Sequence, residues 1–296
     1  MHKYLAAIGF KQLESKRQLK KLLQEIVHLP DSRVIALSKE KTSVAEFCKD
    51  FAENLGICVC GELDEGKLEM EYYFPYLKGN GITSYEDVSV ERHSSQLSYA
   101  GVCDDMRVGI ALIFYLKNKM PYIKAEAENR LPIRGTTLTL SALSVGGTIL
   151  LPFYKDEELR KRIHQESVNR NQLLAAAKQG DEGAIEILTM EDMDIMSTVS
   201  RQIAKQDLFS LVDTCLMPYG VECDQYSIVG EIKDMRMVTN SLTGEKVYIL
   251  TIYCNELTFD VAINIIDLFG EPLVGRRFKG IIWLQGNINY PEEFRL

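Results

Sequence analysis

Alternation between apolar and polar residues is the feature that most limits what this chain can fold into. The stretch ICVCGELDEGKLEMEYYF (57–74) has two alternating segments on either side of the turn sequence DEGK. A period of two places successive side chains on opposite faces of a strand, so this stretch predicts a β-hairpin. Further strands are predicted at VSVERH, SQLSYAG and RVGIALIFYLKN.

Two segments before this hairpin have helical patterns. In LESKRQLKKLLQEIVHLP, Ser15 and Gln18 match a capping box, apolar residues recur at helical spacing, and Pro30 ends the pattern. In TSVAEFCKDFAENLG, Ser43 and Glu46 match a second capping box. We therefore expect two helices ahead of the hairpin.

A second hairpin is predicted from TLTLSALSV and TILLPFY, because Gly146 and Gly147 lie between them as a turn. Two helices followed by hairpin-linked strands are typical of an α+β domain with an antiparallel sheet. We place this domain at residues 1–154. Residues 155–225 are predicted as a helical bridge, which includes GDEGAIEIL and DLFSLVDTCLMP.

The last part of the chain, residues 226–296, is rich in predicted strands. YSIVGEIKDMRMV, VYILTIYCN and LTFDVAIN are followed by a short helix or loop at IIDLFGEPLVG and by a closing strand in RRFKGIIWLQGNINY. A long strand, a hairpin, a short connection and a returning strand are the order of a small OB-like β-barrel.

Charge and hydropathy exclude some classes of function. Of the 296 residues, 46% are hydrophobic, and the net charge of −8 makes binding to a polyanion unfavourable unless the cations are segregated on one face. The longest apolar runs have about nine residues, whereas a membrane-spanning helix needs about 20. The start of the chain lacks a secretory signal pattern, so we expect a cytoplasmic protein with no membrane partner.

The seven cysteines are scattered, and only Cys58 and Cys60 form a close pair. Zinc and redox sites generally use C-x-x-C spacing, often twice. On a strand, the two thiols of a C-x-C pair face the same side. We favour small buried residues in a reducing compartment over a metal or redox site, and predict no metal and no cofactor.

Signatures of phosphate-binding loops, zinc proteases, serine hydrolases and EF-hands are absent from the sequence. The remaining candidates for catalysis are His93, at a predicted strand end, and the adjacent carboxylates Asp104 and Asp105. An exposed polar strand end and a polar hairpin loop are the simpler interpretations of these residues.

The segment VGRRFKGIIWLQGNINY provides candidate binding residues. Arg276, Arg277 and Lys279 would follow phosphates, and Phe278 would stack on a base. Alternation places Arg277 and Lys279 on the same face as Trp283, the only tryptophan. From residue 226 to the end, nine acidic residues nevertheless outnumber seven basic ones. A core role for Trp283 in the barrel is therefore the alternative interpretation.

The phrases MHKYLAAIGF, MPYGVECDQYSIVGEI, SLTGEKVYILTIYCN and VGRRFKGIIWLQG resemble a family of uncharacterised proteins from Firmicutes. This resemblance implies a bacterial, cytoplasmic protein and supplies no catalytic residues. Our leading hypothesis is a non-catalytic protein that binds a protein partner or a small ligand. The alternatives are an enzyme with a cleft between sheet and helical bridge, and single-stranded nucleic-acid binding by the barrel.

Overall fold

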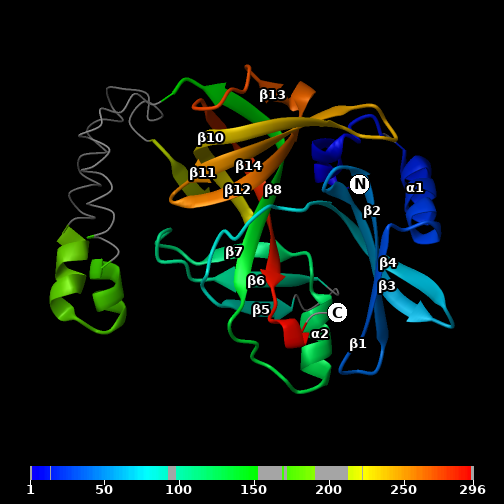
Figure 1. Cartoon of the computed structure of the whole chain (residues 1–296), viewed down its shortest axis with the longest axis horizontal. Coiled ribbons are helices and arrows are strands. Elements are labelled where there is room, and N and C mark those ends of the chain that lie inside the picture. Colours follow the sequence, from blue (N-terminus) through cyan, green and yellow to red (C-terminus); the bar gives the residue numbers. More distant parts are fainter. Residues whose placement is uncertain are drawn as a thin grey trace.

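Strands in two sheets are the commonest regular structure in the described part of the chain (Figure 1). The computed structural model describes residues 2–13, 15–92, 98–152, 169, 172–190, 213–221 and 223–294. The predicted α+β class is confirmed, since a few helices accompany these strands. The helices are η1 (Lys3–Ile8), α1 (Lys16–His28), α2 (Met120–Ala127), η2 (Ile265–Asp267) and η3 (Glu292–Phe294), with further helical turns at 172–178 and 182–190.

The first sheet is antiparallel and has the order β1-β2-β3-β4. Its strands are β1 (Ser32–Leu37), β2 (Ser43–Ala52), β3 (Leu55–Asp64) and β4 (Lys67–Leu77). The β3–β4 hairpin confirms the prediction from alternation. The α1 helix packs against β2 and β3, and the capping box of Ser15 and Gln18 is formed as predicted.

The helix predicted between residues 42 and 56 is wrong, because this segment is strand β2. It pairs with β1 on one side and β3 on the other. Both faces of a central strand between packed layers are buried, so its apolar residues form a run rather than an alternation. The buried residues Val44, Ala45 and Phe47 form this run. The match of Ser43 and Glu46 to a capping box is therefore coincidental.

The second sheet has ten strands and contains a closed five-stranded barrel. The barrel has the order β8-β12-β11-β10-β14, and β14 pairs back to β8. Its strands are β8 (Thr137–Leu150), β10 (Gln225–Thr239), β11 (Lys246–Cys254), β12 (Leu257–Asn264) and β14 (Arg277–Asn289). The four strands predicted after residue 226 are thus confirmed, and β8 comes from an earlier part of the chain. The boundaries at 154 and 225 and the OB-like topology stay predictions.

The remaining strands extend the barrel wall. They are β5 (Val88–Arg92), β6 (Tyr99–Cys103), β7 (Leu112–Leu116), β9 (Cys215–Pro218) and β13 (Leu268–Phe269). The β7 strand pairs with β14 in parallel and continues to β6 and β5, whereas β9 pairs with β10. The helix predicted at DLFSLVDTCLMP is therefore wrong at its end, since residues 215–218 are a strand, and residues 207–212 lie outside the described part.

The hairpin predicted at Gly146 and Gly147 is also wrong, because β8 continues through both glycines, with an irregularity in its pairing to β14 between Ser144 and Gly147. The reason for Gly147 is close packing rather than a turn. A Cβ atom at this position would lie 2.3 Å from the Cε2 atom of Phe278, whose ring crosses the strand inside the barrel. A glycine in a strand often marks such an approach.

Two hydrophobic cores position the elements. One fills the barrel and continues under β5–β7 and α2, and includes Phe278, Ile282 and Leu284 of β14. The other lies between the first sheet, η1 and α1 and the outer wall of the barrel, where it includes Trp283. None of the helices in the described ranges has the length and apolar character needed to cross a membrane.

Candidate functional site

Trp283 is buried, with 5% of its surface exposed, on the outside of the barrel beneath η1. Its ring stacks on Tyr4 at a centroid distance of 5.2 Å, and its indole nitrogen donates a hydrogen bond of 2.7 Å to Asp224 Oδ2. Phe278 is also fully buried. Neither ring is placed to stack on a base from solvent, so the nucleic-acid prediction loses its aromatic support.

The three cations predicted to bind phosphate differ in their surroundings. Arg277 is 6% exposed, and its Nε donates to the Leu151 carbonyl at 3.0 Å. Arg276 is half-buried and donates from Nη1 to the Glu271 carbonyl at 2.7 Å, and Lys279 is also half-buried. Arg276 and Arg277 thus hold backbone groups at one end of the barrel. Binding by these residues stays a prediction.

The two predicted carboxylates differ in their surroundings, because Asp104 is exposed and Asp105 is buried. Asp105 accepts from Ser84 Oγ at 2.6 Å and from Arg107 Nη2 at 2.5 Å. Burial alone would raise the pKa of Asp105, but the hydrogen bonds from Arg107 and Ser84 hold this pKa below its usual value. Asp105 and Arg107 therefore hold this loop together, and catalysis by Asp104 and Asp105 stays a prediction. His93 lies outside the described residues.

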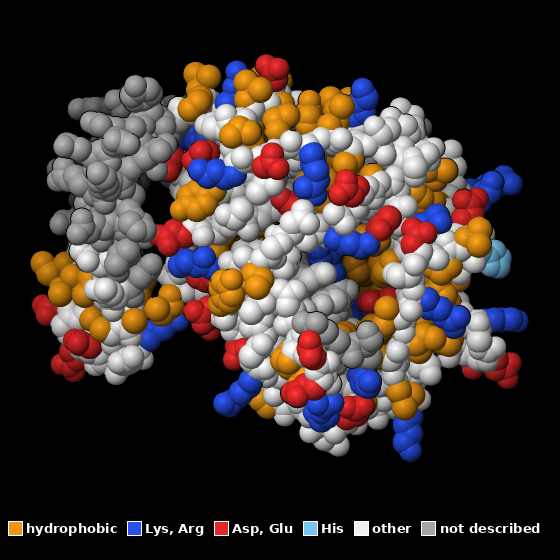
Figure 2. All heavy atoms as spheres, in the orientation of Figure 1, with side chains coloured by type: hydrophobic (Ala, Val, Ile, Leu, Met, Phe, Trp, Pro, Cys, Tyr) orange, Lys and Arg blue, Asp and Glu red, His pale blue; other side chains and the backbone are white. Residues whose placement is uncertain are grey.

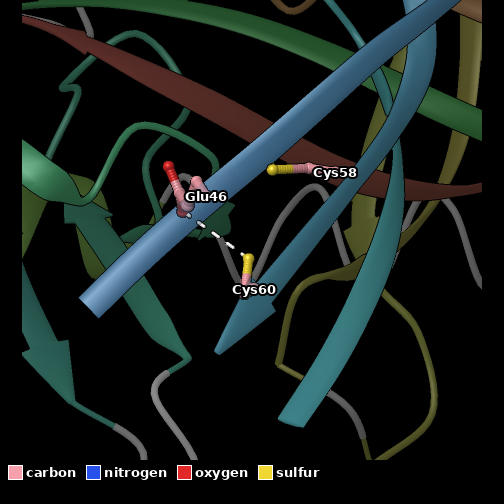
Figure 3. A group of neighbouring side chains, drawn as sticks. All are labelled: Glu46, Cys58 and Cys60. Carbon is pink, nitrogen blue, oxygen red and sulfur yellow. Dashed lines mark hydrogen bonds between the residues drawn. The ribbon is translucent and has the colours of Figure 1, made fainter. Parts of the chain in front are cut away.

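A cluster that the sequence analysis did not predict lies between the first sheet and α2. It consists of Glu46 on β2, Cys58 and Cys60 on β3, and Lys119 before the first turn of α2, all four buried. Strand register assembles it, since Glu46 lies opposite Cys60 and Cys48 lies opposite Cys58. The two thiols of the C-x-C pair are buried on one face, as predicted from alternation (Figure 3).

Lys119 neutralises this cluster. Its ammonium group donates to Glu46 Oε1 and to Cys60 Sγ, the latter at 3.5 Å, and the Cys60 thiol lies 3.7 Å from the same Glu46 oxygen. Burial alone would lower the pKa of Lys119, but Cys60 and Glu46 raise it well above its usual value. The lysine is therefore charged, and the rings of Tyr72 and Phe74 lie within 5.8 Å of it.

The ligand atoms of Glu46, Cys58 and Cys60 all lie within 4.8 Å of one another, as in metal sites. Burial, together with hydrogen bonds from neighbouring thiols, raises the pKa of Cys58 well above its usual value. One observation argues against a metal here. The ammonium group of Lys119 already contacts two of the three groups. The ammonium group of Lys119 therefore occupies the position between Glu46 and Cys60 that a metal ion would need.

A pocket of about 400 Å³ opens beside Glu46. It lies where β1 and β2 meet the start of α2 and the end of β14. Its lining is Val34, Glu46, Asn118, Met120, Pro121, Ile288, Asn289 and Tyr290. Pockets of about 310 and 340 Å³ lie elsewhere, against α1 and the segments on either side of η1, and no buried ion pair is found among their described lining residues. The pocket beside Glu46 therefore combines apolar walls with a buried carboxylate.

A second buried lysine, Lys117, lies two positions before Lys119. Its ammonium nitrogen donates to the Leu77 carbonyl and, at 2.7 Å, to Ser141 Oγ, so it bridges the first sheet and the barrel. No carboxylate contacts it among the described residues. Burial lowers the pKa of Lys117 to about 7, with Lys78 adding to the shift.

Apolar side chains gather at the end of the barrel near β13, at the top of Figure 2. Their exposed fractions are 64% for Ile266, 79% for Phe269, 43% for Leu273 and 62% for Val274. Exposed apolar patches are typical of contact surfaces. This patch agrees with the part of the sequence-based hypothesis that predicts a protein partner, which stays a prediction.

Comparison with known proteins supports the resemblance seen in the sequence. The family described as "Domain of unknown function, E. rectale Gene description (DUF3881)" matches residues 5–286. The chain belongs to this family. No curated protein and no solved structure matches the chain. Membership of DUF3881 agrees with the resemblance to uncharacterised Firmicutes proteins and gives no activity, so the function has to be inferred from the site.

Proposed function

We propose that this DUF3881 protein is a non-catalytic cytoplasmic bacterial protein that binds a small ligand in the pocket beside Glu46. The observation that supports it is the pocket itself, which places a buried carboxylate among apolar side chains at the junction of two sheets. Its volume of about 400 Å³ is in the range of small-molecule sites. Seven free cysteines accord with a reducing compartment.

The lining of the pocket indicates the chemistry of the ligand. Val34, Met120 and Ile288 provide apolar contacts. Because Lys119 already balances the charge of Glu46, the site has no net charge with which to select an ion. Both contacts of Glu46 with the cluster use Oε1. We therefore expect a small, mainly apolar molecule with one hydroxyl or amine group that donates to Glu46.

A pocket-filling variant tests this proposal. Val34 lies opposite Glu46 in the β1–β2 pair and lines the pocket, so Val34→Trp fills the space without removing a polar group. The neighbouring Ile35 is 42% exposed on the other face of β1, which makes Ile35→Trp the matched control. The measurement is ligand-observed NMR with a library of small alcohols and amines.

The expected result is that fragments bind to the wild type and to Ile35→Trp and that Val34→Trp abolishes this binding. Wild-type protein that binds no library member at millimolar concentration would overturn the proposal. Binding that survives in Val34→Trp would also overturn it, because the ligand would then occupy another part of the molecule.

A further inference from the structure

Three thiols lie together on strands β2 and β3 of the first sheet, next to the Glu46–Lys119 pair. Cys48 on β2 lies directly opposite Cys58 on β3, and Cys60 follows on the same face of β3. The Sγ atoms of Cys48 and Cys58 are 2.6 Å apart. Both cysteines are free, and they lie on the two central strands of the first sheet.

The two thiols differ in their access to solvent. Cys48 is partly exposed, whereas Cys58 is 1% exposed. A small disulfide reagent therefore reaches Cys48 before it reaches the buried Cys58. Such a pair, with one accessible and one buried sulfur in contact, is the arrangement in which a first modification is resolved by a second thiol.

We propose that Cys48 and Cys58 are a modification site at which a low-molecular-weight disulfide oxidises the pair to an intramolecular disulfide. In the first step, the Cys48 sulfur attacks the reagent R–S–S–R, whose S–S bond breaks. The Cys48–S–S–R bond forms, and the leaving RS⁻ takes the Cys48 proton as RSH. In the second step, the Cys58 sulfur attacks Cys48 Sγ, the Cys48–S–S–R bond breaks, and the Cys58 proton passes to the departing RS⁻, which leaves as a second RSH. The two protein thiols are oxidised, and R–S–S–R is reduced to two RSH.

The geometry favours Cys58 over Cys60 as the partner of Cys48. The sulfurs of Cys48 and Cys58 need to move by only about half an ångström to reach the bond length of about 2.05 Å. Cys60 lies opposite Glu46 instead and contacts Lys119. A disulfide between Cys58 and Cys60 would join residues i and i+2 of one strand, whose Cα atoms are separated by roughly 6.6–6.8 Å, the upper limit for the bond.

Mass spectrometry of the full chain tests this site. Cys223 is exposed, so the experiment uses a Cys223→Ser background to avoid disulfides between molecules. The reduced protein is treated with glutathione disulfide, its free thiols are alkylated, and it is digested with trypsin. Cleavage after Lys41, Lys49 and Lys67 gives peptide 42–49, which carries Cys48, and peptide 50–67, which carries both Cys58 and Cys60. The Cys60→Ser and Cys58→Ser variants distinguish the two thiols of the second peptide.

The expected result is a disulfide-linked pair of peptides 42–49 and 50–67 that reduction separates. The link persists in Cys60→Ser, which shows that Cys58 is the partner, and Cys58→Ser leaves Cys48 as a mixed disulfide with glutathione. A lasting mixed disulfide at Cys48 when Cys58 is present would overturn the proposal. So would a Cys58–Cys60 disulfide or an unmodified Cys48. None of these readings depends on ligand binding in the pocket.

Discussion

Lys119 and Glu46 form an ion pair that is almost inaccessible to water, with side-chain exposures of 1% and 7%. The two residues are 73 positions apart in the chain, and they meet where the first sheet packs against α2. Removing a charged pair from water costs several kcal/mol per ion, which only close contact and further hydrogen bonds repay. The Cys60 thiol and the rings of Tyr72 and Phe74 provide these contacts.

The position of Trp283 can be tested by fluorescence, because it is the only tryptophan in the chain. We expect weak quenching by acrylamide in the native protein and strong quenching in urea, since the ring is buried under η1. Native quenching as strong as that of the urea-unfolded chain would contradict the buried position. In that case the surface interpretation of this residue would regain support.

The continuous β8 strand predicts different effects of two neighbouring substitutions. Gly147→Ala should lower the free energy of unfolding by about 1–3 kcal/mol, because its new Cβ meets the Phe278 ring. A Cβ atom on Gly146 would meet no other atom within 4 Å, so Gly146→Ala is the matched control and should change stability by about 0.5 kcal/mol or less. Urea denaturation of both variants gives the comparison, and equal losses would contradict the packing of Phe278 on β8.

The buried Lys117 predicts a pH dependence of stability. Its pKa is about 7 in the folded state, below the ordinary value of 10.5, so between these pH values the unfolded chain binds the extra proton. The contribution of Lys117 to the free energy of unfolding is therefore greatest above pH 10.5. It decreases as the pH falls towards 7, by at most about 1.4 kcal/mol per pH unit.

Urea denaturation of the wild type and Lys117→Met between pH 7 and 9.5 isolates this effect, because the other titrating groups are common to both proteins. The stability of the wild type relative to the variant should rise with pH. A constant difference across this range would show that the folded protein holds Lys117 with an ordinary pKa.

Local patterns in the sequence predicted elements whose interactions are local. The α1 helix was predictable because Ser15 and Gln18 form their capping box within one turn. The β3–β4 hairpin and the strands of the C-terminal part were predictable from alternation and turns. The C-x-C pair was predictable as buried, since one strand places both thiols on one face.

Elements defined by distant contacts were not predictable in this way. Phe47 and Phe51 in the β2 segment are four positions apart, as on one face of a helix. Only the pairing of this segment with strands on both sides makes it a strand. The two glycines of β8 indicated a turn. The contact that explains Gly147 is with Phe278, which lies 131 positions away in the sequence and gives no local signal. Likewise, nothing around Lys119 indicates that it meets Glu46.

The coupling between Glu46 and Lys119 tests most directly the account of a carboxylate neutralised by a lysine. The free energy of unfolding is measured in urea for the wild type, Glu46→Gln, Lys119→Met and the double variant. Lys119→Met alone leaves a buried carboxylate unpaired and should cost about 3–5 kcal/mol. The loss of stability in the double variant should be smaller than the sum of the two single losses by about 1 kcal/mol or more. Additive losses would contradict the ion pair and the site built on it.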